Sequence, residues 1–198
     1  FHFVFEKYFR DYLIHDIGIK QDHVYVIPHP VNNREPFSAG HFSYDCVGLS
    51  NSNSEEFISE IINSKDKFKN NKVKILLKSK KTEYADENVI IIKGHLDYNT
   101  YNNYILSAKT ILVPVLNSYK YRLSGSIYDG LVNKKIVFTT STFYSTDYGK
   151  RYPGICIYVD NIDDLISKIS SASYDNNIDS FNLFIMQHSK EETTKRIN

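Results

Sequence analysis

Glycine is scarce in this sequence, with 8 residues among 198, and the glycine-rich motifs of common nucleotide sites are missing. Neither GxGxxG nor GxxxxGK(S/T) occurs, so the usual signatures of dinucleotide-binding and P-loop proteins are absent. The HExxH, CxxC and GxSxG patterns do not occur either. Zinc sites, thioredoxin chemistry and α/β-hydrolase chemistry therefore lose their usual sequence support.

Cysteine is almost absent as well. Cys46 and Cys156 both lie in apolar stretches, which argues against a disulfide scaffold and favours a reducing compartment. No apolar run approaches the roughly 18 residues of a membrane span, and nothing resembles a signal peptide, which predicts a soluble chain. The sequence begins with Phe1 rather than Met, and we expect it to be a piece of something longer.

No charge of one sign dominates. The 24 basic and 23 acidic side chains give a formal net charge of +1, whereas a nucleic-acid-binding domain would show a basic excess. We therefore expect no nucleic-acid partner. With 41% hydrophobic and 24% charged residues the composition is that of a globular protein, and the length suits one large domain or one domain plus a fragment of another.

Short apolar strands and amphipathic helices alternate along the chain. Strands are predicted over 1–5, 24–27, 44–49, 72–77, 89–92, 110–113, 135–138 and 155–159. Helices are predicted over 6–16, 55–68, 97–108, 124–132, 162–169 and 178–188, with Asn53 or Ser54 capping the second and Asp97 the third. Nearly all-apolar strands in such an alternation are typical of a parallel sheet covered on both faces. The predicted fold is therefore α/β, with a Rossmann-like doubly wound sheet.

The domain boundaries follow from composition. The polar stretch 32–41, broken by Pro36 and Gly40, is the best boundary, so residues 1–38 precede the Rossmann-like domain at 39–177. Residues 178–198 are expected to form a C-terminal helix that packs back against the body.

The most informative stretch runs from the strand end at Pro114 to the start of the helix at Ser124 and Gly125. Small residues at a helix start let backbone N–H groups approach an anion, which the helix dipole favours. Arg122 just upstream could clamp a phosphate, and Asp129 a turn later could accept hydrogen bonds from the hydroxyls of a sugar. The alternative is an ordinary serine cap followed by an exposed aspartate, and the residues alone leave the two equally open.

Three segments in order resemble the C-terminal, donor-binding half of GT-B glycosyltransferases of the bacterial polysaccharide-biosynthesis type. The first is Val-Tyr-Val-Ile-Pro-His-Pro-Val at 24–31, similar to the crossing between the two halves. The second is Ile-Ile-Ile-Lys-Gly-His-Leu-Asp at 90–97, followed by Tyr101, Tyr104 and the Ile-Leu-Val-Pro run at 111–114. The third combines Ser124 and Gly125 with Asp-Gly-Leu at 129–131 and Lys-Ile-Val at 135–137.

The resemblance implies a role for each matching position. It places the nucleotide diphosphate at Ser124, Gly125 and Ser126, the ribose at Asp129 and the base at Gly94, His95 and Leu96. Retaining members carry an acid where this chain has Tyr121, and a basic residue where it reads Leu-Ser-Asn-Ser at 49–52. Lys78 and Lys80, with Arg122, could supply the positive charge for the diphosphate, although a solvated loop is the default reading of the run at 78–81.

The resemblance also implies the reaction and its partners. It predicts a hexosyltransferase that moves a sugar from a nucleotide diphosphate, with a UDP-sugar favoured, to a hydroxyl of a glycan or lipid-linked acceptor in capsule, lipopolysaccharide or similar assembly. No Asp-x-Asp motif occurs, so no metal and no other cofactor is expected. The catalytic base and the acceptor contacts are expected in an N-terminal half of which residues 1–38 are the end, so this chain alone should be inactive. The expected location is cytoplasmic, with peripheral association at the inner face of the membrane left open.

Several residues have competing readings. His29 could face the cleft between the halves, although packing at a hinge is favoured. The tyrosines at 98, 101 and 104 read mainly as packing residues, one of which could stack on a base or a sugar. The segment 139–153 is predicted to be a loop on the ligand side, where Tyr144, Tyr148 and Tyr152 could contact the donor.

Two rival functions stay open. One is a nucleotide-sugar epimerase on the same architecture. The other is a noncatalytic interaction domain that presents an aromatic surface formed by Phe1, Phe3, Phe5, Tyr8 and Phe9. A cleft beside the segment 122–129 would favour nucleotide-sugar binding, whereas a closed cleft with an exposed aromatic N-terminus would favour the interaction domain.

Overall fold

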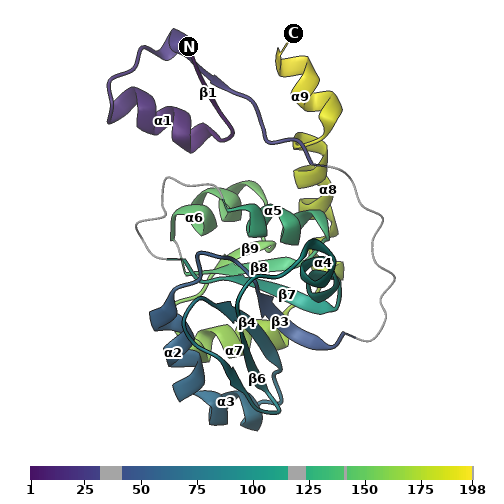
Figure 1. The fold of residues 1–198 in the computed structure, drawn as a ribbon. Coiled ribbons are helices and arrows are strands. Elements are labelled where there is room, and N and C mark those ends of the chain that lie inside the picture. The colour runs from purple at the N-terminus through teal and green to yellow at the C-terminus, as the bar shows by residue number, and fades with distance from the viewer. Residues whose placement is uncertain (32–41, 116–123, 141, 198) are drawn as a thin grey trace.

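The computed structural model describes residues 1–31, 42–115, 124–140 and 142–197, with the backbone alone for 142–144. The described residues form two sheets, a two-stranded one near the N-terminus and a seven-stranded one in the body of the molecule (Figure 1). Tyr121 and Arg122, which precede the predicted helix start at Ser124, and the predicted domain boundary at 38 lie outside the described residues.

The seven-stranded sheet confirms the predicted doubly wound fold. Its strands run in the order β5-β6-β4-β3-β7-β8-β9, and all neighbours are parallel except β5 and β6. Their bounds are β3 Tyr44–Gly48, β4 Ile75–Ser79, β5 Tyr84–Ala85, β6 Val89–Lys93, β7 Ala108–Val113, β8 Ile136–Thr139 and β9 Cys156–Tyr158. The order reverses direction between β3 and β7, which makes the carboxyl ends of these two strands the topological switch point.

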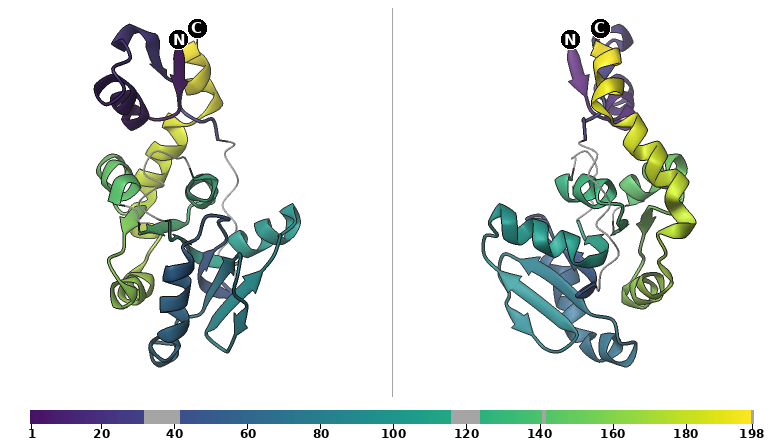
Figure 2. Two further views of the ribbon diagram at one scale, coloured as in Figure 1. Left: turned by 60° about the vertical axis from the view of Figure 1, so that its left-hand side comes forward. Right: turned by 90° about the vertical axis from the view of Figure 1, so that its right-hand side faces the viewer.

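Helices cover both faces of this sheet (Figure 2). One face carries α2 (Glu55–Asn63), α3 (Lys65–Asn70) and α7 (Ile162–Ser171), and an ion pair between Lys67 and Asp163 joins α3 to α7. The other carries α4 (Tyr98–Leu106), α5 (Gly125–Val132) and α6 (Thr142–Arg151). Such an arrangement is what right-handed crossovers produce when the chain first winds one way from the centre of the sheet and then the other.

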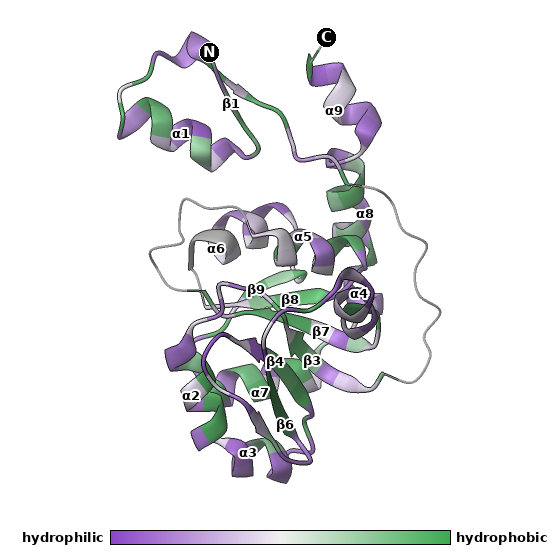
Figure 3. Cartoon of the chain, in the orientation of Figure 1, coloured by the Kyte–Doolittle hydropathy of each residue, from purple (hydrophilic) through white to green (hydrophobic). Residues whose placement is uncertain are grey.

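The core lies between these layers. All five residues of β4 and all four of β8 are buried, and Figure 3 shows apolar residues concentrated on the strands. Gly130 allows α5 to pack closely, because a Cβ there would lie 2.7 Å from Val137 Cγ2 and 3.1 Å from Ile111 Cγ1. Cys46 and Cys156 are buried free thiols, and burial raises the pKa of each to about 12. Both cysteines are therefore core residues, as predicted.

Several elements differ from the sequence predictions. The strand β5 was not predicted, and the single C-terminal helix expected over 178–198 is two helices, over 178–187 and 190–197. The helix predicted over 55–68 is two helices that meet at Ser64, and the strand predicted over 72–77 is β4 at 75–79. The prediction of a loop over 139–153 is wrong, because residues 142–151 form α6. Tyr148 and Tyr152 are fully buried and do not face a ligand, whereas the side chain of Tyr144 lies outside the described part.

The N-terminal unit stands apart from the large sheet. It consists of β1 (His2–Val4), α1 (Lys7–His15) and β2 (Val24–Val26), and the two strands pair in parallel, as the predicted strand–helix–strand order implies. Beside it lie α8 (Ile178–Gln187) and α9 (Lys190–Ile197), which extend from the body toward the N-terminus (Figure 2). Val31 N donates to His188 O, and the Thr193 hydroxyl to Pro28 O, so the C-terminal helices hold the segment that leaves β2.

Candidate functional site

A cavity of about 320 Å³ opens at the carboxyl edge of the large sheet, at the switch point between β3 and β7. Six elements contribute to its lining: the ends of β3, β4, β6 and β7, the first turn of α4 and the start of α5. The lining residues are Leu49, Ser50, Asn51, Ser52, Lys78, His95, Leu96, Tyr101, Val115, Ser124, Gly125, Ser126 and Asp129. Most of the predicted site residues are therefore brought together in one place.

The loop after β3 forms one wall and is pinned to three strand ends. The side-chain amide of Asn53 donates to Gly48 O at 2.7 Å and to Lys78 O at 2.9 Å, and Ser54 N donates to Pro114 O at 2.6 Å. Gly48 is required where β3 ends, because a Cβ would lie 2.8 Å from Leu112 O. These contacts hold the loop, and α2 after it, in one position. Ser54 caps α2 by accepting from Phe57 N, which selects between the two predicted caps.

Lys78 supplies the cationic group of the cavity. It is only 7% exposed, and its Nζ donates to Asn51 Oδ1 at 2.5 Å. A lysine ammonium has three N–H donors, and Asn51 is the one acceptor recorded among the described residues. Lysine is rarely buried without a partner, so this position suits an anion.

Lys80, the other predicted lysine, is exposed and does not line the cavity. Its backbone N–H donates to Glu55 Oε1, while the Ser79 hydroxyl donates to Oε2 of the same carboxylate. Although partial burial alone would raise the pKa of Glu55, these hydrogen bonds hold it below its ordinary value. The Lys80 backbone thus helps to anchor α2.

The start of α5 forms the opposite wall. Ser124, Gly125 and Ser126 all line the cavity, and Ser124 is the N-cap in extended conformation. Its side chain makes no capping hydrogen bond, so it does not satisfy the first N–H groups of the helix. Those groups and the positive end of the helix dipole therefore lie beside the cavity.

Asp129 lies on the same helix and lines the cavity one turn further along. Its Oδ2 accepts a hydrogen bond of 2.8 Å from the hydroxyl of Tyr101 on α4, 28 residues away in the sequence. Both side chains are half-buried. The carboxylate is thus held in place by a second helix and faces the same space as Lys78.

The remaining predicted residues divide between the cavity and its surroundings. His95 and Leu96, after β6, line the cavity, whereas Gly94 lies at the turn that precedes them, with a φ of 108°. His29 does not line it. Its ring packs 5.1 Å from the ring of Phe5 and 5.2 Å from that of Tyr128, measured between centroids. The favoured reading of His29 as a packing residue agrees with this position.

Sequence reasoning did not assign the loop wall or Tyr101 to a site. The Leu-Ser-Asn-Ser segment at 49–52 was noted only because a basic residue is missing from it. Tyr101 was one of three tyrosines predicted mainly to pack, one of which could stack on a base or a sugar. The position of the loop could have indicated the site. A polar loop directly after a buried central strand lies at the carboxyl edge of the sheet, where open α/β sheets bind their ligands.

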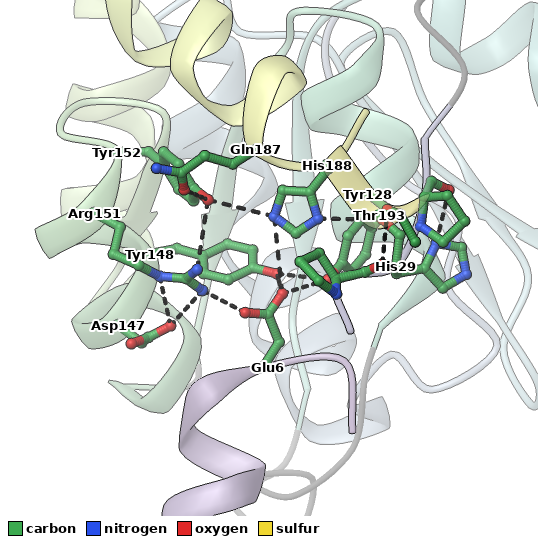
Figure 4. Close-up of polar contacts among 12 residues, drawn as sticks. Glu6, His29, Tyr128, Asp147, Tyr148, Arg151, Tyr152, Gln187, His188 and Thr193 are labelled. Atoms are coloured by element: carbon green, nitrogen blue, oxygen red, sulfur yellow. Dashed lines mark hydrogen bonds and ion pairs between the residues drawn. The ribbon is translucent and has the colours of Figure 1, made fainter. Parts of the chain in front are cut away.

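A second polar centre lies outside the cavity, where Glu6 reaches the body of the molecule (Figure 4). Glu6 is 1% exposed, and its carboxylate accepts hydrogen bonds from the hydroxyls of Tyr128 and Tyr148 and from the guanidinium of Arg151. Tyr128 belongs to α5, and the other two residues belong to α6. Glu6 therefore fastens the N-terminal unit to two helices of the large domain.

The ionisation of this centre follows from its burial. Burial, with the charge of Glu6 adding to it, raises the pKa of Tyr128 and Tyr148 well above the ordinary value, so both hydroxyls stay protonated. Burial would lower the pKa of Arg151, but the carboxylates of Glu6 and Asp147 and the neighbouring Tyr152 together raise it. Burial lowers the pKa of His188 despite the opposing charge of Glu6, so this imidazole is neutral at pH 7.

Glu6 had no clear signature in the sequence. It occupies the N-cap position of α1, where glutamate is not a preferred residue, and its side chain makes no capping hydrogen bond. An acidic residue at an N-cap whose side chain does not cap the helix indicates only weakly that the carboxylate binds a group elsewhere in the chain.

The N-terminal aromatic surface is exposed in part. Phe1 and Phe3 are 83% and 67% exposed and their rings lie beside that of Tyr25, whereas Tyr8 is buried. The cavity expected for nucleotide-sugar binding and the exposed aromatic surface expected for an interaction domain are thus both present. Among the described helices, none is long and apolar enough to cross a membrane, and the described residues contain no acid, histidine or cysteine cluster placed to hold a metal ion.

Comparisons with known proteins bear on the fold. No protein-family model matches the sequence, and no curated protein matches it either. Among solved structures, the chain is similar to Staphylococcus aureus TarM, crystallised as a mutant with fondaparinux, α-GlcNAc-glycerol and UDP, at a TM-score of 0.69 and 16% identity. The match covers 98% of this chain and 42% of TarM.

Two further structures resemble the chain. A glycosyltransferase from Rickettsia africae matches with a TM-score of 0.68 and 12% identity, over 98% of this chain and 61% of that protein. The UDP-GlcNAc 2-epimerase of Methanocaldococcus jannaschii, crystallised with UDP-GlcNAc and UDP, matches less well, with a TM-score of 0.53 and 14% identity over 79% of this chain and 50% of that one. The chain thus has the Rossmann-like fold of the C-terminal half of a GT-B glycosyltransferase, and it spans about 40–60% of the length of the glycosyltransferases it matches.

Proposed function

We propose that the cavity binds a nucleotide-diphosphate sugar and that the chain is the donor-binding part of a glycosyltransferase. The observation that carries this proposal is the convergence, at the switch point, of a buried lysine, an uncapped helix start and a fixed carboxylate. A cavity of this size falls in the usual range for small-molecule sites, about 300–1,000 Å³.

Each wall has a proposed part in binding. The backbone at Ser124, Gly125 and Ser126 and the ammonium of Lys78 bind the diphosphate, because both present N–H donors and positive potential. Asp129 binds the ribose hydroxyls. The base lies against His95 and Leu96, with the backbone at Gly94 shaping that end.

The proposed reaction is transfer of the sugar to a hydroxyl acceptor. Negative charge develops on the diphosphate as the sugar leaves, and Lys78 with the start of α5 stabilises it electrostatically without a metal ion. Arg122, which lies outside the described residues, remains a predicted contributor. A UDP-sugar is the favoured donor, and the presence of UDP in the TarM crystals supports it.

The acceptor and the general base belong to the whole protein rather than to this chain. We propose that a further half supplies both, that this chain alone transfers no sugar, and that the acceptor is a glycan or a lipid-linked molecule of capsule, lipopolysaccharide or similar assembly. A cytoplasmic site of action, with peripheral contact to the inner face of the membrane, goes with that proposal.

Calorimetric titration with UDP, GDP, ADP and CMP tests the donor site. We expect one diphosphate, UDP, to bind, and Lys78→Met to weaken it at least tenfold, about 1.4 kcal/mol. Lys81→Met is the matched control, since Lys81 is an exposed lysine of the same run that does not line the cavity, and it should change the Kd less than about twofold at physiological salt.

Asn51→Asp provides a second arm. The new carboxylate still accepts from Lys78 but places negative charge in the cavity, so it should also weaken the diphosphate while the protein stays folded. Two results would contradict a donor site here: absence of binding by the wild-type chain, or a Kd that neither Lys78→Met nor Asn51→Asp changes.

A further inference from the structure

The contact between Tyr101 and Asp129 joins the helices α4 and α5 at the wall of the cavity. Tyr101 comes from the first turn of α4 and Asp129 from the second turn of α5, and their side chains are joined by a hydrogen bond of 2.8 Å. Both residues line the cavity. The contact is therefore part of the site wall rather than a bond in the core.

Several hydrogen bonds stabilise the start of α4, and they hold Tyr101 in position. Asp97 caps the helix by accepting from Asn99 N, Thr100 N and the Thr100 hydroxyl, and Tyr101 N donates to Asp97 O. One turn later, Tyr104 packs edge-on against Tyr44, with ring centroids 6.0 Å apart. The phenol of Tyr101 thus reaches Asp129 from a helix that is anchored on both sides of it.

Asp129 gains a defined orientation from this bond. An aspartate on a half-exposed helix face samples several rotamers, and ordering it upon ligand binding costs free energy. A hydrogen bond from a phenol to an ionised carboxylate is charge-assisted, and it selects one rotamer before the ligand arrives. A carboxylate offers about four acceptor positions, so the bond to Tyr101 leaves capacity for two more donors.

We propose that Tyr101 is a positioning residue that sets the preference of this cavity for a ligand with vicinal hydroxyls. It holds the carboxylate of Asp129 so that the 2′- and 3′-hydroxyls of a ribose can donate to it together. This inference rests on the proposed donor site, and it goes further by naming the residue that selects ribose.

The test compares UDP with 2′,3′-dideoxy-UDP, which lacks both hydroxyls but keeps the base and the diphosphate. For the wild-type chain we expect UDP to bind about tenfold more tightly. In Tyr101→Phe this ratio should fall to about twofold, with the Kd for 2′,3′-dideoxy-UDP unchanged. Tyr104→Phe is the matched control on the same helix and should keep the wild-type ratio.

A double-mutant cycle separates positioning from other roles. In the Asp129→Ala background, Tyr101→Phe should have no further effect on UDP binding, because no side-chain acceptor is left for the phenol to orient. Equal weakening of both ligands by Tyr101→Phe would show a general structural role, and unchanged Kd values for both ligands would show that the hydroxyl of Tyr101 is not used; either result overturns the proposal. If the wild-type chain binds neither ligand, the donor site fails as well, which distinguishes that outcome from failure of Tyr101 alone.

Discussion

Lys135 is the clearest case of a residue whose chemistry depends on its burial. It precedes β8, is 5% exposed, and has its ammonium 3.4 Å from Leu106 O and 4.5 Å from the ring centroid of Phe42. These weak partners do not replace water, and burial lowers the pKa of Lys135 to about 8 from 10.5. The charged form is therefore less favourable in the folded chain than in the unfolded chain.

We expect Lys135→Met to stabilise the protein by about 2 kcal/mol at pH 7. Between pH 8 and 10.5 the unfolded chain holds more protons at this site, so the wild type gains stability as the pH rises through that window. The advantage of the variant should accordingly shrink from pH 7 to pH 10. Urea unfolding at pH 7 and pH 10 measures the difference in the free energy of unfolding between the variant and the wild type. A difference that is absent or independent of pH would contradict the lowered pKa.

At the scale of elements, the cavity depends on how strand ends are joined. The amide of Asn53 links the carboxyl ends of β3 and β4, and the backbone of Ser54 links the same loop to the end of β7. The sheet thus places the loop next to the start of α5, although the two segments are far apart in the sequence. A change in this loop should affect stability and the site together.

Asn53→Asp should destabilise the chain by about 3 kcal/mol, because a carboxylate oxygen would replace the amide that donates to Gly48 O and Lys78 O. Asn51→Asp is the control. Asn51 is exposed and already acts as an acceptor for Lys78, so the same chemical change should leave stability within about 0.5 kcal/mol. Equilibrium urea unfolding compares the two, and equal effects would mean that the bridge between the strands contributes little.

At the scale of the whole molecule, Glu6 connects the N-terminal unit to the large domain. A two-stranded sheet with one helix is marginally stable alone, and its exposed aromatic residues show that little of it is covered on that side. Its carboxylate anchor, together with the contacts of α8 and α9 to residues 28–31, holds it in place. The anchor includes Tyr128, the residue next to Asp129, so the unit and the cavity wall share α5.

Glu6→Gln should release this unit, because the amide would leave Arg151 with Asp147 as its remaining acidic partner and would place N–H donors beside two hydroxyls. Breaking such a buried pair costs about 3–5 kcal/mol. Hydrogen exchange should rise most in residues 2–26, while β4 and β7 stay protected. Lys7→Gln, which removes an exposed pair with Asp11, should change little. Uniform exchange across the chain would argue against Glu6 as a local anchor.

Much of the fold could be predicted because it depends on local periodicity. The apolar runs of β3, β6, β7 and β8 and the caps at Ser54 and Asp97 are recognisable within a few residues. The α6 helix was missed because its segment, rich in tyrosine and threonine, has no clear apolar stripe. Tyr148 of α6 and Tyr152 just after it are instead buried by packing against Phe184 of α8.

The sequence by itself determined the parallel α/β sheet and the helix start at Ser124, since both follow from the spacing of neighbouring residues. Only the tertiary structure decided which of two nearby lysines lines the cavity, that Tyr101 holds Asp129, and that Glu6 pairs with residues 122 to 145 positions away. Burial patterns repeat within one turn or one strand and can be read locally. A hydrogen bond between distant segments exists only once the core has packed them together.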